Sequence, residues 1–135
     1  MIRLHRLHRL HRLIAALLGA TTLASCAQTP PEPASQRLAR DLRTAIGPAR
    51  CTADSQCRTV PVGAKACGGP AGYWAWSTLN TDTQAVQDLA ARQAKAAREE
   101  VVASGMQSNC AMATDPGARC DAGVCKLDGV RDSTR

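Results

Sequence analysis

The clearest pattern of apolar and polar positions runs from Thr81 to Gly105. Apolar side chains recur there at helical spacing on one face, and most charged residues fall elsewhere on the turn. That face is formed by Ala85, Val86, Leu89, Ala90, Ala94, Ala97, Val101 and Val102. Thr81 followed by Gln84 matches a capping box, and Gly105 is a suitable stop. The pattern predicts one long helix whose alanine-rich face packs on a small sheet.

Shorter elements are predicted on both sides of this helix. The segment 37–46 has leucine, alanine and isoleucine at helical spacing and ends at Gly47-Pro48, which favours a short amphipathic helix. We expect it to pack on the domain with its arginines in solvent; the alternative is a basic face that contacts anionic lipid or a partner. Short strands are predicted over Cys57 to Val62, Tyr73 to Ser77 and Val124 to Leu127.

The N-terminal residues form a basic segment followed by an apolar run. The segment contains Arg3, Arg6, Arg9 and Arg12, and the run from Leu13 to Leu23 is too short to span a bilayer as a helix. The next residues, Leu23-Ala24-Ser25-Cys26, resemble the lipobox of bacterial lipoproteins. The resemblance implies cleavage before Cys26, a diacylglyceryl group on its thiol and an acylated amine. The alternatives are an ordinary cleaved signal peptide and a coincidental match to the motif.

The resemblance also implies a location. In lipoproteins an Asp directly after the lipidated cysteine favours the inner membrane, whereas Ala27 and Gln28 follow Cys26. We therefore expect a cell-envelope protein that is anchored in the outer membrane through lipid on Cys26. Two or three acyl chains anchor a protein firmly, while one chain holds it only reversibly.

These patterns divide the chain into five parts. A lipoprotein signal peptide is expected at 1–25 and a lipidated, proline-rich tether at 26–36. The short amphipathic helix and a linker follow at 37–50, then a disulfide-stapled domain at 51–128 and a flexible tail at 129–135. The predicted fold class is α+β, a small disulfide-rich domain with one long helix packed on short antiparallel strands.

Six cysteines remain once Cys26 is lipidated, and their even number in an oxidising compartment predicts three disulfides. They form two clusters with nearly mirrored spacing, namely Cys51, Cys57 and Cys67, then Cys110, Cys120 and Cys125. The mirrored spacing suggests that Cys67 pairs with Cys110. Cys51 and Cys57 would then pair with Cys120 and Cys125, in an order that the sequence leaves open.

The segment Cys67-Gly-Gly-Pro70, followed by aromatic residues, a helix and a terminal cysteine cluster, resembles a group of small bacterial envelope domains. No activity transfers with this resemblance. The spacings from Cys51 to Cys57 and from Cys120 to Cys125 are similar to pieces of whey-acidic-type inhibitors, but the adjacent cysteine pair of those modules is missing.

All aromatic residues lie close together, at Tyr73, Trp74 and Trp76. In a strand the two tryptophans share a face and Tyr73 points to the other. We expect at least one tryptophan to anchor the core against the long helix, because the domain has no other large ring. The alternative makes these three residues, with the glycine-rich loop before them, a recognition edge for a protein, peptide or glycan.

The amino-acid composition limits which catalytic and metal-binding sites the chain can form. Histidine occurs only at His5, His8 and His11, in the part that we expect to be removed, so Ser-His-Asp, Cys-His and histidine-based zinc sites are excluded. No Cys-x-x-Cys pair is present. We therefore expect no catalytic residues, no metal and no cofactor. Removing four N-terminal arginines from the 17 basic residues leaves 13 against 11 acidic ones, which does not favour nucleic acid as a partner.

The leading hypothesis is a lipid-anchored, non-catalytic envelope protein that acts as a structural or binding module, with an envelope protein or a glycan as its partner. A second hypothesis is an inhibitor of an extracellular hydrolase, either a protease or a lysozyme. It requires an exposed, rigid loop between Cys57 and Pro70 or between Ala111 and Gly117. A third is an enzyme that uses carboxylates or lysines alone.

Overall fold

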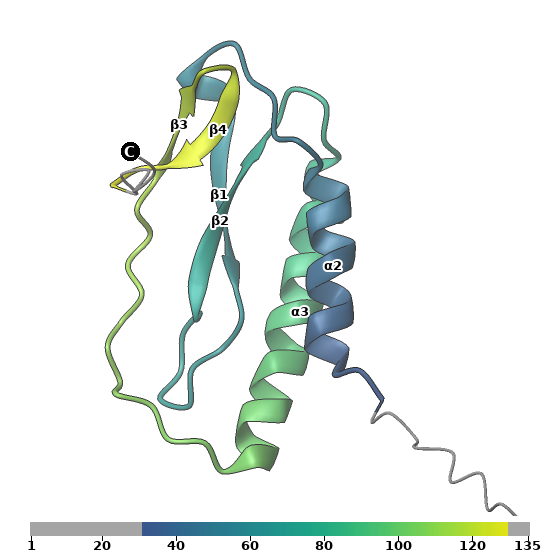
Figure 1. The fold of residues 1–135 in the computed structure, drawn as a ribbon, viewed down its shortest axis with the longest axis vertical. Helices are drawn as coiled ribbons and strands as arrows, with labels where there is room; N and C mark the ends of the chain where they lie inside the picture. The colour runs from purple at the N-terminus through teal and green to yellow at the C-terminus, as the bar shows by residue number, and fades with distance from the viewer. Residues whose placement is uncertain (1–30, 130–135) are drawn as a thin grey trace, which may run out of the picture. The chain divides into compact units, whose positions relative to one another are not determined.

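The computed structural model describes residues 31–129 (Figure 1). The expected signal peptide, the expected lipidation site at Cys26, the tether up to residue 30 and the tail from residue 130 lie outside the described residues. Within the described part, no helix combines the length and apolar character needed to cross a bilayer. The elements are α2 (Ala34–Ile46), the 3-10 turn η1 (Asp54–Gln56), β1 (Cys57–Val62), β2 (Gly72–Ser77), α3 (Thr83–Ser104), β3 (Ala118–Asp121) and β4 (Val124–Leu127).

The strands form two small antiparallel sheets. β1 pairs with β2 so that Val60 lies opposite Trp74, and β3 pairs with β4 so that Cys120 lies opposite Cys125. One long helix, short antiparallel strands and three disulfides confirm the predicted α+β, disulfide-rich fold class. β1, β2 and β4 lie where the sequence predicts them, with β2 one residue longer, whereas β3 was not predicted.

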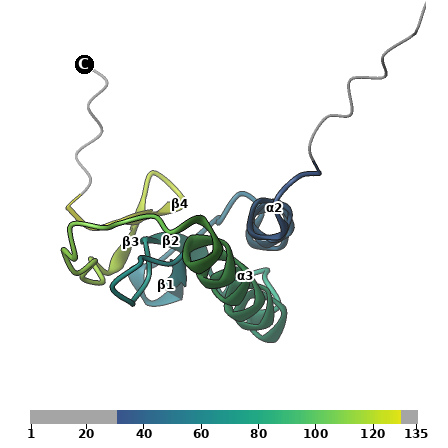
Figure 2. The same ribbon diagram turned by 90° about the horizontal axis from the view of Figure 1, so that it is seen from below.

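The core lies between the β1–β2 hairpin and the two helices, which run antiparallel beside it (Figures 1 and 2). Val60, Val62 and Trp76 are buried on the hairpin. The helices contribute Leu42 and Ile46 from α2, and Val86, Ala90 and Ala97 from α3. Few large apolar residues are available, so disulfides supplement this small core.

Two predicted boundaries near α2 were wrong. The helix begins at Ala34 instead of Arg37, directly after Pro33, whose fixed φ suits a helix start. Residues 34–36, which we assigned to the tether, are therefore helical. The domain does not begin at Cys51, because Leu42 and Ile46 are buried in the shared core and α2 belongs to the same compact unit.

The ends and the face of α3 also refine the prediction. Asp82, not Thr81, caps the helix, since its carboxylate accepts hydrogen bonds from the backbone N–H groups of Gln84 at 2.9 Å and Ala85 at 3.1 Å. Gly105 ends the helix in a left-handed conformation, as predicted. The apolar face does not extend to Val102, which is exposed because the core ends one turn earlier.

Candidate functional site

Three disulfides brace the domain, and their connectivity resolves the open pairing. Cys67 is bonded to Cys110, as predicted. The remaining bonds are Cys51–Cys120 and Cys57–Cys125, so these two pairs cross in the sequence. These two bonds connect β1 and the residues before it to the β3–β4 hairpin. They lie at the open end of the β1–β2 hairpin, whereas the Cys67–Cys110 bond lies at its loop.

These crossed disulfides bring sulfur atoms close together without forming a metal centre. The Sγ atoms of Cys51, Cys57 and Cys125 lie within 4.8 Å of one another. Cys57 and Cys125 are bonded to each other, and Cys51 is bonded to Cys120. A disulfide offers no thiolate ligand, so this cluster is a structural staple.

The three aromatic candidates differ in how deeply the structure buries them. Trp76 is only 3% exposed, and its indole N–H donates to the carbonyl of Thr59 at 3.3 Å. This confirms a tryptophan core anchor and removes Trp76 from the proposed recognition edge, because its side chain is buried in the core cluster. Trp74 and Tyr73 are half-buried, and the Tyr73 hydroxyl donates to the carbonyl of Ala113 at 3.5 Å. The proposed recognition edge therefore keeps only Tyr73 and Trp74, whose rings are partly accessible.

A polar hollow of about 240 Å³ opens where α2 ends and β2 turns into α3. Its lining includes three residues with hydroxyl groups, an asparagine and an arginine. The Thr44 hydroxyl donates to the carbonyl of Arg40 at 3.0 Å, so it can only accept a further hydrogen bond. The residues around it are Thr44, Ala45, Ile46, Gly47, Pro48, Ala49, Arg50, Ser77, Asn80 and Thr81. We call this the polar hollow. Sequence analysis missed it because its residues come from separate segments that carry no motif.

One wall of the polar hollow is fixed to the terminal hairpin. The carbonyl of Ala49 accepts a hydrogen bond from the N–H of Cys125 at 2.9 Å, and Arg50 forms a backbone bridge with Val124. The N–H of Cys51 donates to the carbonyl of Gly123 at 3.0 Å. Since Cys51 is also disulfide-bonded, the backbone that carries Arg50 is held on both sides.

The segment between Ser77 and Asn80, two further lining residues, is bonded to the 3-10 turn. The N–H of Thr78 donates to the carbonyl of Gln56 at 2.9 Å, and the N–H of Leu79 donates to the buried Ser77 hydroxyl at 3.1 Å. The Leu79 side chain itself is exposed. A site whose walls are already ordered loses less conformational entropy when a ligand binds, so the polar hollow is suited to recognition.

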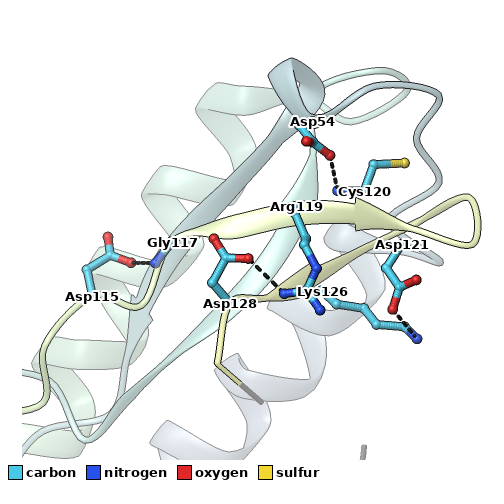
Figure 3. A network of polar contacts seen from close by, with 8 residues as sticks. All are labelled: Asp54, Asp115, Gly117, Arg119, Cys120, Asp121, Lys126 and Asp128. Carbon is cyan, nitrogen blue, oxygen red and sulfur yellow. Dashed lines mark hydrogen bonds and ion pairs between the residues drawn. The ribbon is translucent and has the colours of Figure 1, made fainter. Parts of the chain in front are cut away.

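The β3–β4 hairpin beside this end carries two exposed ion pairs (Figure 3). Arg119 donates to Asp128 at 2.8 Å, and the Lys126 amine lies 3.1 Å from an Asp121 oxygen. The hydrogen bond to Asp128 raises the pKa of Arg119. Exposed pairs of this kind contribute little to stability, so their main effect is to give the hairpin a mixed charged surface.

Two further carboxylates connect this region to the rest of the chain. Asp54 accepts a hydrogen bond from the N–H of Cys120 at 2.8 Å. Asp115 accepts one from the Thr59 hydroxyl at 2.7 Å and one from the N–H of Gly117 at 2.9 Å, and the bond from Thr59 is the main reason that its pKa is lowered. Each carboxylate therefore fixes a loop, and neither belongs to the lining of the polar hollow.

The other end of the hairpin carries an exposed, braced loop. Cys67 and the residues around it, 66–69, are exposed, and the Cys67–Cys110 bond links them to the segment after α3. The N–H of Gly68 donates to the carbonyl of Lys65 at 3.0 Å, and the N–H of Lys65 donates to the carbonyl of Gly69 at 3.1 Å. The loop between Cys57 and Pro70 thus has the exposure and bracing that the inhibitor hypothesis requires.

Comparison with known proteins assigns neither a family nor a function to this chain. No family model, no curated protein and no solved structure matches this chain.

Proposed function

We propose that this chain is a lipid-anchored, non-catalytic protein of the bacterial cell envelope whose disulfide-braced domain is a binding module for an envelope protein or a glycan. The observation that carries the binding role is the polar hollow, whose lining segments are fixed by backbone hydrogen bonds and by the Cys51–Cys120 disulfide. The lipobox at Cys26 carries the anchoring role.

Cysteine pairing supports the envelope location. All six cysteines of the described residues form disulfides, a state that persists in oxidising compartments and is rare in the cytosol. The seventh cysteine is Cys26, the position at which lipoproteins receive their lipid. The pairing and the lipobox are independent observations that favour the same compartment.

The lining of the polar hollow favours a polar ligand group. Thr81 and Asn80 offer hydrogen-bond donors and acceptors, as sugar hydroxyls and peptide groups require. Thr44, whose hydroxyl donates to the Arg40 carbonyl, offers an acceptor. Arg50 adds a positive charge, which suits a carboxylate on a saccharide or a peptide. Muropeptides combine both kinds of group, so they are the first ligands to test.

The inhibitor hypothesis remains the second candidate, because a specific observation favours it. The loop at 66–69 is exposed and is held by the Cys67–Cys110 disulfide, and a braced loop can enter the active site of a hydrolase without a large entropy cost. On this hypothesis the contact lies at the loop and leaves the polar hollow free.

One experiment separates the two candidates. The lipidated chain, purified from membranes of its host, is titrated with soluble muropeptides and, separately, assayed against lysozyme and trypsin. Arg50→Gln is compared with Arg37→Gln, a matched loss of charge at an exposed position outside the hollow. We expect muropeptide binding that weakens at least tenfold in Arg50→Gln only.

Two results would contradict the binding-module proposal. Equal binding by both arginine variants would show that the polar hollow is not the site. Inhibition of a hydrolase that is lost in Ala66→Arg but retained in Arg50→Gln would favour the inhibitor hypothesis. Intact mass spectrometry of the same preparation tests the anchor, since the proposal requires a chain that starts at an acylated Cys26.

A further inference from the structure

The chain enters the described domain at the end where α3 finishes. Ser35, in the first turn of α2, donates its backbone N–H to Glu100 at 2.9 Å and its hydroxyl to the second oxygen of the same carboxylate. Glu100 lies about one turn before Ser104, the last residue of α3. The beginning of α2 and the end of α3 therefore lie at the same end of the domain (Figure 1).

The same end carries most of the exposed large apolar side chains of residues 31–129. Val102 is 75% exposed, Met106 63% and Met112 80%, and only Leu79 is exposed at the other end. A hollow of about 160 Å³ lies between the β1–β2 loop and the end of α3, lined in part by Ala64, Ala66, Val101 and Met106. We call Ala64, Ala66, Val101, Val102 and Met106 the apolar end.

Chain length limits how far this end can lie from Cys26. Pro31, the first described residue, follows Cys26 by five positions, and a fully extended chain of that length spans at most about 18 Å. α3, with 22 residues, is about 33 Å long. A lipid on Cys26 therefore holds the apolar end near the bilayer, whereas the polar hollow lies beside the start of α3, one helix length away.

We infer that the apolar end rests on the bilayer in which Cys26 is anchored, with Val102 and Met106 in contact with the lipid. This inference rests on the proposed lipid anchor. Apolar side chains gain free energy at the boundary between headgroups and acyl chains. A short tether makes the contact intramolecular, so even a weak surface is occupied at the resulting effective concentration.

The neighbouring charges indicate that this contact is apolar. Lys65, in the lining of the hollow at this end, and the exposed Arg98 are positive, and Glu99 and Glu100 at the same end are negative, so together these four residues give no net charge for anionic lipid. We therefore expect the contact to persist at high salt. In this orientation the polar hollow points away from the membrane, and the braced loop at 66–69 lies next to the membrane. The orientation thereby favours the binding-module proposal over the inhibitor hypothesis.

Methionine oxidation tests the inference in the full lipidated chain. Hydrogen peroxide transfers one oxygen atom to the thioether sulfur, giving the sulfoxide and water, and the rate falls when the sulfur is covered. The chain is reconstituted in vesicles of phosphatidylethanolamine and phosphatidylglycerol, and the oxidation of Met106 is followed by peptide mass spectrometry. Leu79→Met supplies a matched reporter at the opposite end, where the side chain is exposed.

We expect Met106 to oxidise at least fivefold more slowly on vesicles than in the unanchored Cys26→Ala chain mixed with the same vesicles. The methionine introduced at position 79 should oxidise equally fast in both. Val102→Glu, at an exposed position outside the core, should restore fast oxidation of Met106 while the chain stays anchored. Protection should remain when the salt concentration is raised.

The outcomes distinguish failure of the membrane contact from failure of the proposed lipid anchor on Cys26. If the chain is acylated at Cys26 and stays with the vesicles, yet Met106 oxidises as fast as in Cys26→Ala, the inference is wrong and the anchor stands. If the mass shows no lipid on Cys26 and the chain does not stay with the vesicles, both the anchor and the inference fail.

Discussion

Arg43 lies over the indole of Trp74, with the central carbon of its guanidinium 4.3 Å from the ring centroid. The contact joins α2 to β2 at the edge of the core, where Trp74 is half-buried and packs against the buried residues. A cation above an aromatic face is attracted by the negative charge of that face. One arginine of α2, which the sequence analysis expected to be solvated, therefore helps to hold the helix on the sheet.

Replacing this arginine tests the contact. We expect Arg43→Gln to lower the free energy of unfolding by about 0.5–1 kcal/mol, the usual range for an exposed cation–π pair. Urea denaturation measures the loss. Arg37→Gln, an exposed arginine of the same helix for which the structure gives no such contact, is the control and should change stability less. Equal losses in the two variants would contradict a specific role for the ring.

The two tryptophans should differ in their importance for stability. Trp76 is buried among Val60, Val86 and other core residues, so we expect Trp76→Ala to cost about 3–5 kcal/mol. Trp74→Ala should cost less, because its ring is partly exposed and loses fewer contacts. Thermal and urea unfolding of both variants measure the difference. A larger loss for Trp74→Ala would overturn the assignment of Trp76 as the core anchor.

Local patterns predicted the elements well where they are self-contained. The strands β1 and β4 and the stop at Gly105 follow from apolar alternation and from glycine's freedom to adopt a positive φ, which are properties of neighbouring residues. The Cys67–Cys110 bond was suggested by the mirrored spacing of the two cysteine clusters, a pattern that relates distant positions.

Features that depend on tertiary contacts could not be predicted in this way. β3 has no alternating pattern, and it is a strand because β4 pairs with it and Cys120 is bonded to Cys51. The first turn of α2 is also held by the contact of Ser35 with Glu100, residues 65 positions apart. The polar hollow is assembled from separate segments. Predicting any of these three features requires knowing which distant segments of the chain come into contact.

The cap of α3 provides a direct test of one corrected boundary. Asp82→Ala should cost about 1 kcal/mol, because the carboxylate that satisfies two backbone N–H groups is lost. Thr81→Ala should be nearly neutral, since Asp82 is the residue whose side chain caps the helix. Urea unfolding of the two variants compares them. The opposite order would restore Thr81 as the cap.

The contact between Ser35 and Glu100 should make stability depend on pH. Hydrogen bonds from Ser35, mainly from its hydroxyl, lower the pKa of Glu100 in the folded chain. The unfolded chain then binds a proton at higher pH than the folded one. This contribution to stability is full above the ordinary pKa of glutamate and is lost as the pH falls through the lower pKa of the folded state.

Glu100→Gln should therefore flatten the acid side of the stability profile relative to the unaltered chain, with the difference largest near neutral pH. The size of the effect is small, because the carboxylate is only partly buried and is screened by solvent. Glu99→Gln is the matched control, at an exposed neighbouring position for which the structure gives no contact with Ser35. Profiles of the two variants with the same shape would contradict a specific role for the contact.

The three disulfides should be reduced in an order set by their exposure. A thiol reductant must reach a sulfur atom to attack it, and Cys67 and Cys110 are both exposed, while Cys51, Cys57 and Cys125 are buried. Limited dithiothreitol treatment of the folded chain, followed by alkylation and peptide mass spectrometry, should therefore label Cys67 and Cys110 first. Early labelling of Cys57 or Cys125 would mean that the crossed pair is accessible and would contradict the staple at this end of the hairpin.

Removing the exposed bond should also leave the rest of the domain folded. Cys67 and Cys110 close a loop with a sequence separation of 43, for which chain entropy gives a loss of about 4 kcal/mol at most. The double variant Cys67→Ser and Cys110→Ser should keep its helix content, because both cysteines are exposed and neither belongs to the core cluster, and the crossed disulfides remain. The matched double variant Cys57→Ser and Cys125→Ser removes a bond beside the core and should destabilise the fold more, since it also leaves two buried hydroxyls among apolar side chains. Circular dichroism during urea unfolding ranks the two variants, and the reverse order would show that the loop end, rather than the crossed pair, holds the domain together.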